Sequence, residues 1–359
     1  VGTGSVAVSA GSLTWSGNTG KATYNSGTSV TLTAKVTTGS FSGWSGDCTG
    51  TDLTCTVAMS ATRNVTAIFK AFSAVSLPQT GQTKCYDKDG KDISCAGTGQ
   101  DGDLKKGMVW PDPRFKDNGD KTVADNLTGL VWTKDAGTPT VGTCTGGDKD
   151  WQGALDYVAC LNTSKYLGYT DWRLPNINEL ESLVSAGASK PSLLSGHPFD
   201  KVQSDYYWSS TTYANDTSSA WIVSMSAGGV SAVGKSLYYY VWPVRSGQVG
   251  DLAKSVIWQT GQTNCYDEDG KDTSCNDTGQ DGDLKKGVAW PSPRFTDNSI
   301  ASSADKTVTD NLTGLVWAKD AGIPTVDSCA GGKMNWQAAI DYVACLNKAK
   351  HLGYTDWRL

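Results

Sequence analysis

The sequence has no apolar run long enough to cross a membrane, and its charged residues are not gathered into blocks of one sign. The 31 Lys and Arg residues and the 36 Asp and Glu residues are interspersed and leave a net charge of −5. The printed sequence therefore holds no membrane span. It also offers no basic surface of the kind that binds nucleic acid or an anionic membrane.

Histidine is also scarce, since His197 and His351 are the only two, and no Cys-x-x-Cys pair occurs. A zinc site needs such ligands at short spacing, so zinc is disfavoured. No Ser/His/Asp, Cys/His or paired-carboxylate set can be assembled from the motifs. The sequence therefore predicts a protein that is not an enzyme.

Cysteine, by contrast, is plentiful and falls into five local pairs. An even number in pairs, each within one region, predicts five disulfides and an oxidising compartment, so we expect a secreted, extracellular or cell-surface protein. The predicted bonds are Cys48–Cys55, Cys85–Cys95, Cys144–Cys160, Cys265–Cys275 and Cys329–Cys345.

Much of the sequence occurs twice. DNLTGLVW at 125–132 returns at 310–317, and LGYTDWRL at 167–174 returns at 352–359. The offset grows from 180 to 185 residues because the second copy has a small loop insertion. This pattern predicts a tandem domain duplication in which the second copy stops about seventy residues before the counterpart of the first copy's end.

Hydrophobic periodicity and turn residues predict the local structure. Residues 1–70 alternate like short strands with one buried face, including strands at 5–9, 21–24, 29–36, 54–59 and 63–69. Within the first copy, the pattern predicts a helix over 151–162 capped by Asp150 and a second helix that begins after Asn176, with Glu179 at the capping-box position. Four strands are then expected at 207–211, 220–225, 230–233 and 238–244.

Two short stretches suggest special roles. The symmetry around Gly90 predicts a hairpin with a three-residue loop that places Cys85 opposite Cys95. The glycines at 97, 99 and 102 match a dinucleotide-binding fingerprint, but no parallel strand precedes them, no helix is expected to follow, and Asp277 replaces the first glycine in the second copy. We therefore expect no nucleotide there.

Aspartates cluster in the same stretches and leave two interpretations open. They could form a structural calcium site, although no EF-hand spacing is present, or they could stabilise solvated turns with their own backbone. No other cofactor is predicted. The candidate calcium ligands are Asp87, Asp89, Asp92, Asp101, Asp103, Asp267, Asp269, Asp272, Asp281 and Asp283.

The sequence resembles two known families. The stretch GTSVTLTAKV…GWSGDC…C-V-x-M in 1–70 resembles the internalin B-repeat-like module of bacterial surface proteins. GQDGDLKKG, DNLTGLVW, GYTDWRLPN, YYWSSTTY and YYVWPVR resemble the bacterial Lcl C-terminal-like domain, completely over 77–247 and in its first part over 256–359. This resemblance implies an α+β architecture: a small all-β module followed by two C-type-lectin-like domains, each with two helices on a twisted antiparallel sheet, the second truncated.

The aromatic and polar residues of the first copy's C-terminal half suit a ligand surface, and the alternative is that alternate residues fill the sheet core. Trp208, Trp221 and Trp242 are expected in the core. The sequence predicts an adhesion protein with tandem lectin-like modules for a glycan or protein on a cell or matrix surface. The alternative is a structural subunit that binds copies of itself in a secreted filament or sheath. The candidate ligand residues are Tyr206, Tyr207, Tyr213, Asn215, Asp216, Tyr238, Tyr239 and Tyr240.

Overall fold

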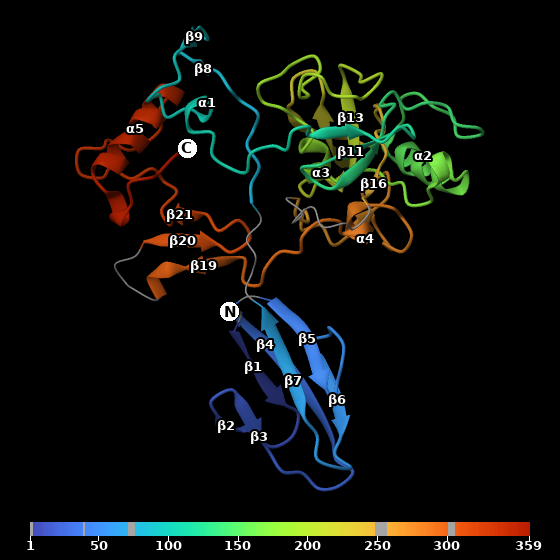
Figure 1. Ribbon diagram of the computed structural model, residues 1–359, viewed down its shortest axis with the longest axis vertical. Helices are drawn as coiled ribbons and strands as arrows, with labels where there is room; N and C mark the ends of the chain where they lie inside the picture. Colours follow the sequence, from blue (N-terminus) through green and yellow to red (C-terminus); the bar gives the residue numbers. More distant parts are fainter. Residues whose placement is uncertain (1–2, 39, 71–75, 248–256, 301–305) are drawn as a thin grey trace. The chain divides into compact units, whose positions relative to one another are not determined.

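The computed structural model describes residues 3–38, 40–70, 76–247, 257–300 and 306–359. Residue 256, where the second copy is predicted to start, lies outside the described residues. Contacts divide the chain into two units, one of residues 1–74 and 290–321 and the other of residues 75–289 and 322–359. Both are built from short antiparallel strands in small sheets with few helices, which is consistent with the predicted α+β class (Figure 1).

The N-terminal module is all β, as its alternating pattern predicts. Its strands are β1 (Thr3–Val8), β2 (Thr14–Ser16), β3 (Thr19–Lys21), β4 (Ser29–Thr38), β5 (Ser40–Gly46), β6 (Thr54–Ala58) and β7 (Val65–Lys70). The sheets are β1-β4-β6, β5-β7 and β2-β3. Val30, Ala34 and Trp44 form the core together with the disulfide-bonded Cys55. The predicted strand at 21–24 is wrong, because β2 and β3 close a two-residue turn before it.

Residues 115–246, called the first body below, hold two antiparallel sheets and two α-helices. One sheet joins β10 (Phe115–Asp117), β11 (Thr122–Asp125), β12 (Leu130–Thr133) and β16 (Val244–Ser246), and the other joins β13 (Tyr206–Thr212), β14 (Ser219–Ser224) and β15 (Val230–Gly234). The helices are α2 (Trp151–Thr163) and α3 (Ile177–Glu181). Pairing of β16 with β12 brings the end of the body against its beginning.

Helix boundaries follow the predicted caps. The Asp150 carboxylate accepts a hydrogen bond from the Gly153 amide at 2.7 Å and begins α2. In the second copy, Asn335 does the same for Ala338 at 2.9 Å and begins α5 (Trp336–Lys348). A complete capping box at the start of α3 is also confirmed.

The predicted strand at 238–244 is wrong. Regular pairing begins only at Val244, and the preceding tyrosines make isolated bridges, Tyr239 to Lys149 and Tyr240 to Tyr207. The chain here must leave one sheet and reach the other, so it cannot continue a single ladder. The strands predicted at 207–211, 220–225 and 230–233 are present as β13, β14 and β15.

Residues 77–107 and 257–287, called the first and second hairpin segments, have the same structure. Each has two short strands and one helical turn: β8 (Cys85–Tyr86), β9 (Asp92–Ile93) and α1 (Asp101–Leu104), then β17 (Cys265–Tyr266), β18 (Asp272–Thr273) and α4 (Asp281–Leu284). The predicted register is wrong, because Cys85 lies opposite Ile93 and not opposite Cys95. Within the loop, Asp87 accepts from the amides of Asp89 and Lys91. A helical turn does begin at Asp101, within the glycine motif.

The rest of the second copy is divided between the two units. β19 (Phe295–Asp297), β20 (Thr307–Asp310) and β21 (Val316–Ala318) form one small sheet, and α5 lies in the other unit. Trp317 and Trp336 are 56% and 50% exposed, whereas their counterparts Trp132 and Trp151 are fully buried. In the first copy these rings are covered by residues from 175–247, and the printed sequence has no second set of them.

All five predicted disulfides form. Cysteine therefore contributes five covalent links, each within one module or hairpin segment, and no free thiol is present. The bonds are Cys48–Cys55, Cys85–Cys95, Cys144–Cys160, Cys265–Cys275 and Cys329–Cys345.

Candidate ligand-binding groove

The first body is completed by the second hairpin segment, which belongs by sequence to the other copy. The end of β13 makes the closest contacts. Thr211 Oγ1 donates to the buried Asp281 carboxylate at 2.8 Å. The Thr212 amide donates to Gln262 Oε1 at 2.9 Å, and Gln262 Nε2 donates back to the Thr212 carbonyl at 3.1 Å. This reciprocal pairing fixes the segment on the strand.

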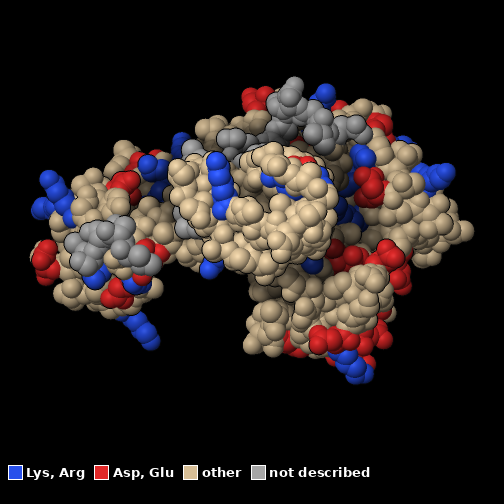
Figure 2. Space-filling view, turned by 90° about the horizontal axis from the view of Figure 1, so that it is seen from below, with Lys and Arg blue, Asp and Glu red and all other residues tan. Residues whose placement is uncertain are grey.

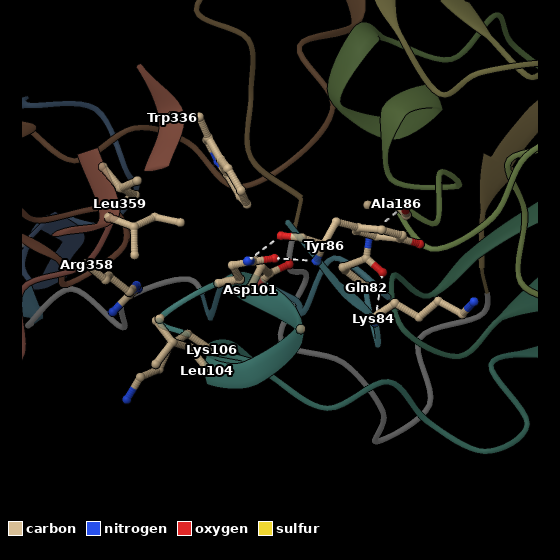
Figure 3. Close-up of a pocket in the computed structure, with 14 residues that line it drawn as sticks. Gln82, Lys84, Tyr86, Asp101, Leu104, Lys106, Ala186, Trp336, Arg358 and Leu359 are labelled. Carbon is tan, nitrogen blue, oxygen red and sulfur yellow. Dashed lines mark hydrogen bonds between the residues drawn. The ribbon is translucent and has the colours of Figure 1, made fainter. Parts of the chain in front are cut away.

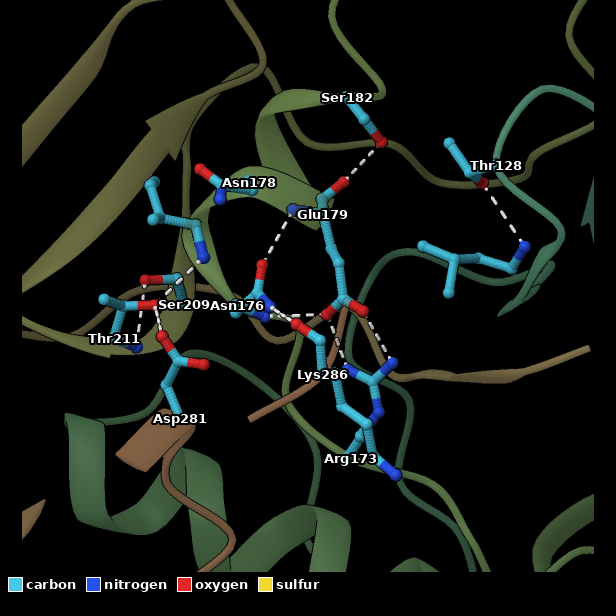
Figure 4. A network of polar contacts seen from close by, with 12 residues as sticks. Thr128, Arg173, Asn176, Asn178, Glu179, Ser182, Ser209, Thr211, Asp281 and Lys286 are labelled. Carbon is cyan, nitrogen blue, oxygen red and sulfur yellow. Dashed lines mark hydrogen bonds and ion pairs between the residues drawn. The ribbon is translucent and has the colours of Figure 1, made fainter. Parts of the chain in front are cut away.

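The residues at the start of α3 supply a second set of contacts, and Figure 4 draws those of Asn176 and Glu179. Asn176 Nδ2 donates to the Lys286 carbonyl at 3.1 Å, and Asn178 Nδ2 donates to the Trp258 carbonyl at 2.8 Å. The Asn176 backbone amide is itself held by Glu179, whose carboxylate also accepts two hydrogen bonds from Arg173 at 2.6 and 2.7 Å. A buried ion pair therefore supports the α3 end of the docking surface.

Lys235 joins the segment to α2. Its ammonium lies 4.0 Å from the centre of the Trp151 ring and donates to the Asp267 carbonyl at 3.0 Å. Only 2% of this lysine is exposed, which is rare for a cation without a carboxylate partner. Burial lowers the pKa of Lys235 to about 8.

This lowered pKa predicts a pH dependence. Between pH 8 and 10.5 the unfolded chain binds a proton at Lys235 that the folded chain has lost, so stability rises with pH across that window. We expect the free energy of unfolding to increase by on the order of 1 kcal/mol between pH 7.5 and 9.5. Urea titrations at the two pH values measure it. The Lys235→Met variant should show no such rise, and an equal rise in both proteins would contradict the assignment.

A groove of about 590 Å³ opens where the segment meets the end of the first body. Three aromatic rings line it, Tyr213, Trp221 and Trp258, all half-buried. The first two meet edge to face with ring centres 5.0 Å apart. Asn178, Glu181, Asn215 and Gln262 add amide and carboxylate groups to the wall. Such a mixture of flat apolar faces and a few polar groups is typical of small-molecule sites.

Two of the predicted ligand residues, Tyr213 and Asn215, therefore line this groove. Asp216 lies beside it on the surface but serves the turn: its carboxylate accepts from the hydroxyls of Ser218 at 2.6 Å and Ser219 at 2.8 Å. These hydrogen bonds lower the pKa of Asp216. We assign it to positioning the turn that carries Asn215.

The other predicted tyrosines lie elsewhere. Tyr206 and Tyr239 meet with ring centres 5.5 Å apart, and Tyr238, which precedes Tyr239 in sequence, is 61% exposed. The prediction that Tyr207 contacts a ligand is wrong. This residue is fully buried, and its hydroxyl donates a hydrogen bond to the Ala136 carbonyl at 3.0 Å. Tyr240 is half-buried against Tyr207.

Trp208 and Trp242 are buried as expected, but Trp221 is half-buried and lines the groove, so its assignment to the core is wrong. The groove residues Trp258 and Gln262 were missed altogether. They lie 45 and 49 residues beyond Tyr213 along the chain, and no local pattern links them to it.

The aspartates proposed for calcium make turn and ion-pair contacts. Asp92 pairs with Lys84 at 2.7 Å, Asp103 accepts from the Gly99 amide at 3.1 Å, and Asp101 accepts from Thr80. Across the described ranges, no group of three or more His, Cys, Asp or Glu side chains is arranged to hold a metal ion. Calcium binding therefore stays a prediction without a preformed site in this part of the chain.

Two protein families match this chain. The Lcl C-terminal domain matches residues 121–245 and 306–359, and the divergent InlB B-repeat domain matches residues 4–73. These are the families whose resemblance the motifs predict, and they indicate a bacterial surface or adhesion-type protein. The Lcl matches begin after each hairpin segment. No curated protein gives a significant match.

The surface is of mixed charge (Figure 2), and the cysteines are all paired. None of the helices within the described ranges is long and apolar enough to cross a membrane. On the face drawn in Figure 2, basic and acidic side chains are scattered among uncharged ones. The five disulfides are compatible with an extracellular location.

Proposed function

We propose that this chain is a non-enzymatic extracellular protein of the bacterial surface, and that its first C-type-lectin-like module binds a glycan on a cell or matrix surface. The groove beside Tyr213 carries the proposal. Sugar rings present an apolar C–H face and a rim of hydroxyls. Tyr213, Trp221 and Trp258 offer ring faces for the first, and Asn215 and Glu181 offer an amide and a carboxyl group for the second.

A lectin-like fold is part of the same proposal. Two helices packed with small antiparallel sheets agree with it, and the Lcl family match covers this body. The β module at residues 3–70 would act as a spacer that presents the binding module.

Glycan binding is tested with the labelled full-length chain on a saccharide array. We expect Tyr213→Ala and Asn215→Ala to weaken binding of the recognised saccharide at least about tenfold, which corresponds to ~1.4 kcal/mol. Tyr238→Ala, on the other aromatic surface, is the matched control and should bind like the wild type. Near-ultraviolet circular dichroism verifies that each variant is folded.

Two results would overturn this assignment. Loss of binding in Tyr238→Ala with normal binding in Tyr213→Ala would show that the ligand binds at the Tyr206–Tyr239 surface. Absence of binding to every saccharide on the array would show that the ligand is not a glycan.

A second candidate function is favoured by one observation. The second hairpin segment docks on a body that belongs to the other copy, so neighbouring modules interlock. Modules that interlock in this way suit a structural subunit of an extracellular filament or sheath.

A further inference from the structure

The groove beside Tyr213 is uneven in charge. Glu181, the last residue of α3, is the only described residue of its lining that is charged at neutral pH. Within the described parts of the chain, no lysine or arginine lines this groove. A ligand that enters it therefore meets one negative charge and no positive one.

The Glu181 carboxylate is not used by the fold. Glu179, two residues before it, accepts two hydrogen bonds from Arg173. Among the residues that the structure describes, no hydrogen bond or ion pair engages the side chain of Glu181. Partial burial raises the pKa of its carboxyl group, which means that its charged form is poorly compensated. A cation bound in the groove would supply the missing compensation.

The aromatic rings of the groove favour the same sign of charge. The face of an aromatic ring is partly negative and attracts cations, most strongly in tryptophan. Trp221 and Trp258 are two of the three rings that line the groove, and Tyr213 meets Trp221 edge to face at 5.0 Å between ring centres. The rings and the carboxylate therefore act together on a positively charged ligand.

Elsewhere the chain supplies cations to its own rings. Lys235 lies 4.0 Å from the centre of the Trp151 ring, and Arg245 lies 3.9 Å from that of Tyr169. Within the described ranges, no lysine or arginine is placed in this way over a ring of the groove. The groove thus resembles these internal sites, but without the cation.

Another cavity of the same unit shows that an exposed ring alone does not create this selectivity. It measures about 370 Å³ and is lined by parts of the first hairpin segment and of α5 (Figure 3). Trp336 contributes a half-exposed ring there, but Lys84, Lys106 and Arg358 line the same cavity. Three basic side chains would repel a cationic ligand.

These features identify a class of saccharide. A sugar that carries a free amino group is positively charged and keeps the apolar C–H face of its ring. The ring can stack on an aromatic side chain, the ammonium group can pair with Glu181, and a hydroxyl can bond to the Asn215 amide. Acetylation of the amine removes the charge and with it the ion pair.

We propose that the groove binds an amino sugar through its ammonium group, with Glu181 as the counter-ion and the three aromatic rings as the wall. This inference rests on the proposed glycan binding and deepens it by naming the class of ligand. A neutral sugar lacks the ion pair, and an acidic sugar is repelled by the carboxylate.

The experiment compares two probes that differ in charge, a glucosamine tetrasaccharide and its fully N-acetylated form. Each is titrated into the full chain at about pH 6, well below the pKa of a primary amine. Tryptophan fluorescence reports binding because Trp221 and Trp258 lie in the groove. We expect the glucosamine probe to bind at least about tenfold more tightly than the acetylated one.

The decisive variant is Glu181→Gln, which removes the charge and keeps the shape. We expect it to bind the glucosamine probe at least about tenfold more weakly than the wild type and to lose the preference over the acetylated probe. Glu268→Gln is the matched control, since Glu268 is exposed, lies outside the groove and changes the net charge equally. It should bind both probes like the wild type, and circular dichroism verifies folding.

Three results would overturn the inference: no binding of the glucosamine probe, equal binding of both probes by the wild type, or equal loss in Glu181→Gln and Glu268→Gln. The last would assign the attraction to net charge and not to the groove. The saccharide array separates the two proposals. If a neutral or acidic saccharide binds there and needs Tyr213, glycan binding stands and only the amino-sugar assignment fails.

Discussion

Replacing Glu179 with Ala should lower the free energy of unfolding of the first body by about 3–5 kcal/mol. Arg173 and Glu179 are both buried, and the carboxylate accepts two hydrogen bonds from the guanidinium and one from the Asn176 amide. Its removal leaves a buried cation without compensation and breaks the capping box that begins α3. Urea denaturation followed by tryptophan fluorescence measures the loss.

The control is an exposed ion pair in the same unit. Lys88 and Asp89 are 2.8 Å apart but both lie in solvent, so Asp89→Ala should change stability by less than about 0.5 kcal/mol. A Glu179→Ala chain as stable as the Asp89→Ala chain would show that the ion pair does not hold α3 in place.

Trp151→Ala should destabilise the first body by about 3–5 kcal/mol, whereas Trp336→Ala should cost less than about 1 kcal/mol. The two tryptophans occupy the same position in the two copies. Trp151 is fully buried, donates to the Ser209 carbonyl at 2.8 Å and carries the Lys235 ammonium on its ring. Trp336 is half exposed.

Differential scanning calorimetry of the two variants compares the losses directly. Because the duplication supplies the same residue on the same helix, intrinsic helix propensity cancels and only burial differs. Equal losses at the two positions would mean that Trp336 is covered in solution, in contradiction to its exposure here.

Local features were predictable from the sequence. The Asp150 and Asn335 caps, the Asn176–Glu179 capping box and the five disulfides are each determined by residues close in the chain. The alternation of Val30 and Ala34 likewise gave the buried face of the N-terminal module. In these cases the residues that determine the local structure all lie within one short stretch of the sequence.

Long-range choices were not predictable. Periodicity shows that neighbouring tyrosines on a strand face opposite sides, but it does not show that Tyr207 is the buried one. Burial of Lys235 follows from Trp151 and the second hairpin segment, which lie far from it in sequence.

The candidate site shows the same limit. Tyr213 and Asn215 were found from their residue types, but one wall of the groove, which includes Trp258 and Gln262, comes from the second hairpin segment. Because the two segments have nearly the same sequence, sequence alone cannot say which body each one packs against. The body on which each segment packs depends on the path of the chain after each module.

Docking of the second hairpin segment on the first body supports both the groove and the pH dependence. Amide hydrogen exchange at Thr212, whose N–H donates to Gln262 Oε1, reports it directly. The account predicts a protected Thr212 amide in the wild type and in Asp101→Lys, and exchange at least about tenfold faster in Asp281→Lys. Equal exchange in all three chains would show that the segment does not dock there.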